Sequence, residues 1–161
     1  MTNNLFISED ETVEVKINIA ANGGKLTCWS DDEVPDGIED FETYSAKFRR
    51  PNYRDTTRLM DAALQVGSNG EFAMSVSEVR YRRIVQLLVE WDFKDSAGKV
   101  MPATEASVNT LNPQVALALA DGLETALGLF QGLTDDVLEE AEAMKAQIDQ
   151  PQTEQQLKPS E

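Results

Sequence analysis

Polar and apolar side chains alternate without a break from Thr12 to Ile19. The apolar set in this segment is Val13, Val15, Ile17 and Ile19. Because successive side chains of a β-strand point to opposite faces, a period of two places all four on one face of a strand. The chain therefore begins with β-structure, and the short turn sequence that follows favours an antiparallel return.

Two further strands are expected before residue 50. Residues 20–24 end in two glycines that tolerate positive φ, so residues 26–30 can return as a second strand. The acidic segment 31–37 has the composition of a loop. Apolar residues alternate again over 41–48, which predicts a third strand.

Pro51 marks the change from strands to helices. Asn52 is a suitable N-cap. The helix after it is expected to bury one apolar stripe, made of Tyr53, Thr57, Met60 and Leu64. The polar sequence 67–70 is expected to end this helix.

Three more helices follow from local signals. The strongest helical pattern begins at Ser75 and continues through Leu88 to Trp91. A short helical turn is expected over 104–109. Asn112 followed by Pro113 is a cap with proline at the first helical position, which marks the start of an apolar helix.

The most apolar run of the chain extends over 115–133, and it must be compared with a membrane span. Asp121 and Glu124 lie near its centre, where each carboxylate costs about 2.5–3.5 kcal/mol on insertion scales. The run therefore predicts a buried helix that ends around Gly128 to Gly132, with no insertion into a membrane.

A last helix is expected after the cap at residues 134–136, and Pro151 ends it. Its apolar stripe consists of Val137, Leu138, Ala141, Met144 and Ile148. The sequence thus predicts one α+β domain over 1–149. It has a small antiparallel sheet of about three strands within 10–48, about five helices within 52–149, and a disordered polar tail at 150–161.

The net charge of −15 is unevenly distributed along the 161 residues. Residues 1–46 carry eleven acids against two lysines, and residues 100–161 repeat that ratio, so each flank has a charge of −9. The centre, 47–99, has ten basic and seven acidic residues and a charge of +3. Either the acidic flanks pair with this centre, or the flanks or centre meet a charged partner. Nucleic acid is disfavoured as a partner, because −15 repels a polyanion.

The chain has no histidine, and its one cysteine is Cys28. Catalysis by Ser-His-Asp or Cys-His groups, zinc sites with histidine and disulfides within the chain are therefore excluded. The paired carboxylates 31–32 and 135–136 fit a loop and a helix cap. We expect no enzyme activity, no metal and no cofactor. The N-terminal segment lacks the basic and apolar regions of a signal peptide, which favours a reducing cytoplasm.

Two groups of residues are candidates for binding a partner. Basic residues gather where the third strand gives way to a helix, and the candidates there are Arg49, Arg50, Tyr53, Arg54 and Arg58. They either pair with acids of the same chain or recognise an acidic segment of a partner. The second group belongs to the stripe of the last helix, Val137, Leu138, Met144 and Ile148, which either packs on its own domain or enters the groove of a partner.

The order of several segments resembles that of tail assembly chaperones of tailed bacteriophages. The resemblance rests on Phe48-Arg49-Arg50-Pro51 before a helix, on 87–92, on 98–105 and on Leu111-Asn112-Pro113 before an apolar helix. It covers roughly 41–133 and implies a non-catalytic protein that binds the tape measure protein or tail tube subunits in the host cytoplasm. Self-association into a homo-oligomer is a further expectation.

Two alternatives to a chaperone stay open. A permanent structural component of a phage tail or baseplate would be found in the virion. An acidic inhibitor that mimics nucleic acid would fit the net charge of −15, although the positive centre argues against it.

Overall fold

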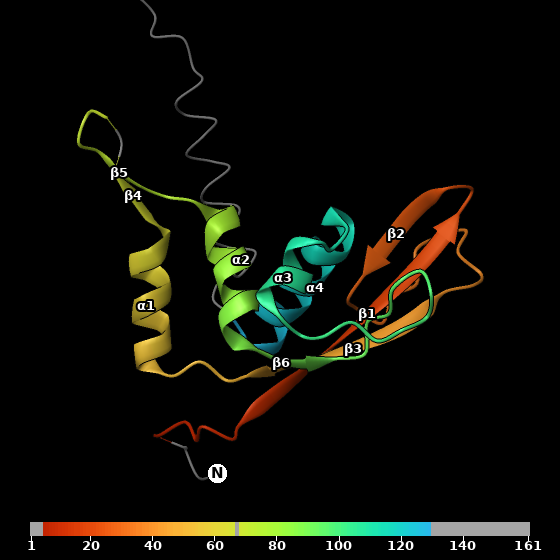
Figure 1. The fold of residues 1–161 in the computed structure, drawn as a ribbon, viewed down its shortest axis with the longest axis horizontal. Coiled ribbons are helices and arrows are strands. Elements are labelled where there is room, and N and C mark those ends of the chain that lie inside the picture. Colours follow the sequence, from red (N-terminus) through yellow and green to blue (C-terminus); the bar gives the residue numbers. More distant parts are fainter. Residues whose placement is uncertain (1–4, 67, 130–161) are drawn as a thin grey trace, which may run out of the picture. The chain divides into compact units, whose positions relative to one another are not determined.

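The computed structural model describes residues 5–66 and 68–129 and shows a mixed α+β fold, as predicted (Figure 1). A four-stranded antiparallel sheet has the order β2-β1-β3-β6, and a two-stranded sheet pairs β4 with β5. The strands are β1 Thr12–Asn22, β2 Lys25–Trp29, β3 Glu42–Arg49, β4 Leu64–Val66, β5 Phe72–Met74 and β6 Leu88–Trp91. The helices are α1 Tyr53–Ala63, α2 Val76–Leu87, α3 Glu105–Asn109 and α4 Pro113–Ala126.

The first three strands confirm the sequence prediction. A turn of Gly23 and Gly24, both at positive φ, joins β1 to β2 and fixes the pairing of Asn22 with Lys25. β1 pairs with β3 along a longer ladder that includes Val15 opposite Ala46. The apolar set of β1 thereby shares one face of the sheet with its neighbours, as the alternation required.

The fourth strand was not expected, because the sequence pattern predicted a helix as far as Trp91. α2 instead ends at Leu87, and Leu88 adopts an extended backbone. β6 then pairs with β3, and the Trp91 indole N–H donates to the main-chain oxygen of Met101 at 2.7 Å. The segment 87–91, apolar except for Glu90, fits a helix and a strand alike, and its pairing with β3 determines that residues 88–91 form a strand.

A second correction concerns the segment between α1 and α2. The sequence predicted a polar connection that ends a helix, whereas β4 and β5 form a short antiparallel hairpin there. We call α1 with this hairpin the arm. The arm is joined to α2 through its helix: α1 packs on α2 in a small cluster of Leu59, Ala63 and Val79 that is separate from the main core.

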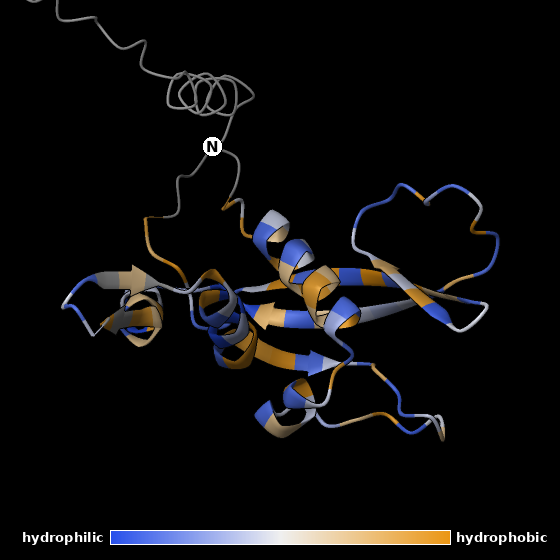
Figure 2. Cartoon of the chain, turned by 90° about the horizontal axis from the view of Figure 1, so that it is seen from above, coloured by the Kyte–Doolittle hydropathy of each residue, from blue (hydrophilic) through white to orange (hydrophobic). Residues whose placement is uncertain are grey.

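The main core lies between one face of the four-stranded sheet and the helices α2 and α4 (Figure 1). Its most deeply buried large side chains are Ile17 and Phe48 from the sheet and Leu119 and Leu123 from α4. Figure 2 shows apolar residues on the inner sides of these elements, whereas the loop between β2 and β3 is mostly hydrophilic. Cys28 is half-buried beside this core, and burial raises the pKa of its thiol.

α4 begins at the predicted cap, where Asn112 accepts a hydrogen bond from the Gln114 N–H. It ends before Gly128, whose φ of 69° suits a residue without a side chain. Among the described helices, none has the length and apolar character that a membrane crossing needs. The expected last helix, its stripe and the tail at 150–161 lie outside the described residues.

A buried carboxylate joins α2 to α4. Glu124 is only 4% exposed and accepts hydrogen bonds from Arg80 at 2.7 and 3.2 Å and from Arg83 at 2.9 Å. Arg80 also lies 2.9 Å from Asp121. Two guanidinium groups therefore compensate the charge of Glu124 in the core, which explains how a carboxylate occurs in so apolar a helix.

Gly122 lets α4 approach the sheet closely. A Cβ atom at this position would lie 2.5 Å from Val15 Cγ1 and 2.9 Å from the Cβ of Ser30. Glycine to alanine in a helix is ordinarily stabilising by about 0.5–1 kcal/mol, so this contact should reverse the usual sign.

We predict that Gly122→Ala lowers the free energy of unfolding by about 1–3 kcal/mol, because Val15 is buried and cannot move aside without strain. Urea denaturation of the full chain measures this change. Thr125→Ala, at an exposed position of the same helix, serves as the control and should change stability by less than about 1 kcal/mol. An unchanged or raised stability of Gly122→Ala would contradict the close packing of α4 on β1.

Candidate partner-binding surface

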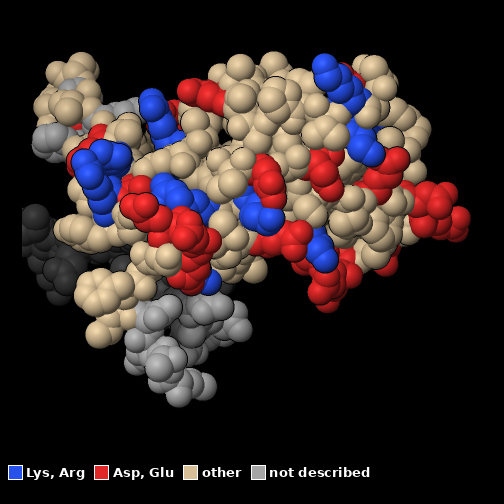
Figure 3. Space-filling view, turned by 60° about the horizontal axis from the view of Figure 1, so that its bottom comes forward, with Lys and Arg blue, Asp and Glu red and all other residues tan. Residues whose placement is uncertain are grey.

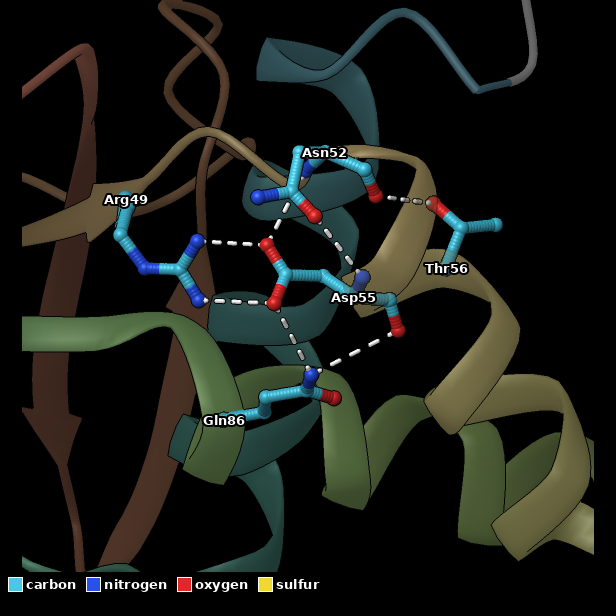
Figure 4. Close-up of polar contacts among 5 residues, drawn as sticks. All are labelled: Arg49, Asn52, Asp55, Thr56 and Gln86. Atoms are coloured by element: carbon cyan, nitrogen blue, oxygen red, sulfur yellow. Dashed lines mark hydrogen bonds and ion pairs between the residues drawn. The ribbon is translucent and has the colours of Figure 1, made fainter. Parts of the chain in front are cut away.

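The junction between β3 and α1 is held by a bidentate ion pair (Figure 4). Arg49 is the last residue of β3, and its two terminal nitrogens donate to the two carboxylate oxygens of Asp55 at 2.5 and 3.1 Å. Asp55 is 7% exposed. A planar guanidinium that meets a carboxylate through two bonds fixes direction as well as distance, so this pair sets where α1 starts.

The same carboxylate completes the N-terminal cap of α1. The Asn52 side chain accepts from the Asp55 N–H, and the Asn52 N–H donates to Asp55 Oδ2, both at 3.0 Å. This reciprocal arrangement is a capping box. Gln86, near the end of α2, donates to Asp55 Oδ1 at 3.4 Å. Asp55 therefore connects β3, α1 and α2 at one point (Figure 4).

The ion pair changes the titration of Asp55. The hydrogen bonds from Arg49, and after them the Asn52 N–H and Gln86, hold the pKa of this carboxyl below its ordinary value, against the opposing effect of burial. A carboxylate with a lowered pKa in the folded state stabilises the fold above its unfolded pKa. That stability is lost as the pH falls through the folded pKa.

The structure divides the basic group that the sequence singled out. Arg49 belongs to the internal junction, and Arg50 lies 3.1 Å from Glu11. Tyr53, Arg54 and Arg58 are exposed on α1. The five residues thus do not form one continuous recognition edge, and only the three on α1 lie where a partner could reach them freely.

The apolar stripe predicted for α1 exists, but it faces the opposite way from the prediction. Tyr53 is 88% exposed, Met60 41% and Leu64, the C-cap residue, 47%, and Thr57 is also exposed. We call these four residues the outer stripe. The buried side of α1 carries Asp55, Leu59 and Ala63 instead. The prediction was wrong because Asp55 is drawn inward by Arg49, which turns the other side of the helix outward.

Two cations flank the outer stripe. Arg54 and Arg58 are one helical turn apart and exposed, and neither forms an ion pair with any residue that the structure describes. Figure 3 shows Lys and Arg interleaved with Asp and Glu over the visible face of the molecule. The outer stripe is therefore an apolar surface that lies beside two arginines and the exposed Asp61 of the same helix.

The second predicted group, Val137, Leu138, Met144 and Ile148, lies outside the described residues. Within 5–66 and 68–129, no cluster of three or more potential metal ligands forms. The arrangement on α1 is suited to non-covalent contact: a tyrosine and aliphatic side chains to be covered, and guanidinium groups to pair with carboxylates.

Comparison of the whole chain with known proteins finds no matching family profile, no matching curated protein and no matching solved structure. The interpretation of this surface rests on its own geometry and on the sequence.

The sequence identified Asn52 as a cap but missed Asp55 and Gln86. A usable signal was present, because Asn52 with an acid three residues later is the spacing of a capping box. The capping box predicts the contact of Asp55 with Asn52, whereas the burial of Asp55 comes from its contacts with Arg49 and Gln86. Gln86 had no such signal, since its contact depends on how α2 packs.

We predict that Asp55→Asn lowers the free energy of unfolding at pH 7 by about 2–3 kcal/mol, because it leaves Arg49 partly buried without a countercharge. The loss should be smaller than for a fully buried pair, since the Arg49 side chain is 28% exposed. Below about pH 4 the free energies of unfolding of the variant and the wild type should approach each other, because protonation of Asp55 removes the same charge from the wild type.

Urea midpoints measured from pH 3 to 7 test this prediction. Asp61→Asn, an exposed position of the same helix, is the control and should follow the wild type throughout. If the urea midpoints of Asp55→Asn and the wild type differ by the same amount at every pH in this range, the charge of Asp55 does not stabilise the fold as described.

Proposed function

We propose that this chain is a non-catalytic tail assembly chaperone or adaptor that holds a tape measure or tail tube protein during assembly in the host cytoplasm. The observation that supports this most is the outer stripe of α1, where Tyr53, Met60 and Leu64 are exposed; Val66 of the adjoining hairpin is exposed as well. Exposed apolar surface of this kind is typical of a site that another protein covers.

The chemistry of the arm favours one kind of client segment. An amphipathic helix could lay its apolar side along the outer stripe, as in helix-to-groove recognition. Arg54 and Arg58 would then pair with acidic residues beside that apolar side. The chain as a whole, at a net charge of −15, would keep the complex in solution by repelling other complexes.

The proposed function requires a tape measure protein from the same genome, and that protein is the client to test. We predict that co-expression with the wild-type chain raises the soluble fraction of that protein and that the two co-purify. The double variant Arg54→Glu/Arg58→Glu should weaken the complex by at least about tenfold, because it places acids against the acidic client segment. Its own urea midpoint should stay close to that of the wild type, since both side chains are exposed.

Lys94→Glu/Lys99→Glu is the matched control, because it makes the same change in net charge at two exposed positions outside the arm. If it weakens the complex as much as the arm variant does, the loss of affinity is caused by the change in net charge and the arm is not the binding surface. An unchanged solubility of the tape measure protein in the presence of the wild-type chain would contradict the proposed function as a whole.

A further inference from the structure

β1 is longer than the strand that pairs with it on its outer side. β2 covers β1 only from Asn18 to Asn22, whereas β3 covers the other side as far as Thr12. The part of β1 before Asn18 therefore has a strand on one side and none of the described strands on the other (Figure 1).

The direction of the main-chain groups in this part follows from the ladder. The Arg50 N–H donates to the Glu11 oxygen at 2.8 Å, in register with the pair Thr12 and Arg49. Because hydrogen-bonding directions alternate along a strand, odd-numbered residues of β1 bond to β3 and even-numbered residues face the β2 side. The N–H and C=O groups of Thr12, Glu14 and Lys16 consequently point outward. We call these six groups the open edge.

No described residue closes the open edge. β2 ends at Trp29, and the Asp31 oxygen accepts from the Asn18 side chain rather than from the main chain of β1. Among the backbone hydrogen bonds of the described residues, none outside the ladders reaches Glu14 or Lys16. An exposed row of unpaired donors and acceptors is a template for another strand.

A groove of about 730 Å³ runs beside this edge, between the β1–β2 side of the sheet and α4. Leu117 and Asp121 of α4 form part of one wall, and both are exposed. A strand added about 4.8 Å from β1 would direct alternate side chains toward this wall, where pockets can select among them. The charged lining of the groove is Glu14, Asp31 and Asp121 against Lys16 and Lys25, and Asp121 already lies 2.9 Å from Arg80. The acidic flank 1–46, which contains the open edge, carries eleven acids against two lysines, and this excess favours a positively charged occupant.

We propose that an extended, lysine- or arginine-bearing segment of a partner protein adds to the open edge as a fifth strand of the sheet. The site is separate from the outer stripe and does not depend on the proposed chaperone function. Main-chain hydrogen bonds to Glu14 and Lys16 would hold the segment, and the wall of α4 would select its side chains.

The test uses the full chain and a displayed library of random twelve-residue peptides as the probe. Glu14→Pro removes an outward N–H and places a ring on the open edge without breaking a bond to β3, so the fold should be retained. Glu14→Ala is the matched control, because it loses the same side chain and keeps the main-chain groups. Leu117→Arg is a second variant that blocks the wall from an exposed position.

We expect selected peptides to be rich in Lys or Arg and to bind Glu14→Ala within about threefold of the wild type, because this variant loses one acid of the groove and keeps the main-chain groups. They should bind Glu14→Pro and Leu117→Arg at least about tenfold more weakly, as expected for the loss of main-chain bonds or of the pocket wall. Bound peptide should slow amide hydrogen exchange at Glu14 and Lys16. The arm variant Arg54→Glu/Arg58→Glu should bind these peptides normally, which separates this site from the proposed function.

The inference is overturned if no peptide is selected, or if Glu14→Pro and Leu117→Arg both bind as the wild type does. Helical peptides whose protection falls on another surface would overturn it too. Should Glu14→Pro fail to fold, as judged by circular dichroism, Leu117→Arg and the exchange of Glu14 and Lys16 decide the outcome alone.

Discussion

The bidentate contact between Arg49 and Asp55 is the interaction on which the placement of the candidate surface depends. It joins the end of β3 to the first turn of α1, and Gln86 adds α2 to the same carboxylate. Elsewhere α1 is attached mainly through a small apolar cluster against α2. A cluster of few side chains fixes the orientation of a helix about its own axis only weakly, whereas a bidentate ion pair combined with a capping box fixes it closely. The outward direction of the outer stripe follows from this junction.

Ion pairs also account for most of the basic centre of the chain. Arg50 reaches Glu11 in the N-terminal acidic flank, and Arg80 and Arg83 reach Glu124 in the C-terminal one. The flanks therefore do pair with the centre, which is one of the two interpretations that the charge pattern allowed. Among the described residues, the cations of the centre that form no ion pair are Arg54 and Arg58 on the arm and Lys94 and Lys99 after β6.

The sequence predicted well wherever a local pattern decided the structure. The alternation from Thr12 to Ile19, the two-glycine turn, the caps at Asn52 and Asn112 and the start of a helix at Ser75 all depend on neighbouring residues, and the structure has them. Prediction failed where distant contacts decided. The segment ending in Trp91 forms β6 because it pairs with β3. The outer stripe of α1 faces solvent because Arg49 binds Asp55 on the buried side of the helix. The open edge was foreseeable in part, since the expected second strand was shorter than the first.

α1 is held in place by the Arg49–Asp55 pair, and we propose that its outer stripe contacts the client. Hydrogen–deuterium exchange of the complex tests this contact directly. The full chain is compared alone and with the tape measure protein that we propose as its client. The account predicts slower exchange across residues 53–66 in the complex, with the sheet residues 42–49 unchanged. Unchanged exchange over 53–66 in a complex that forms, with protection elsewhere, would contradict the claim that the arm binds the client.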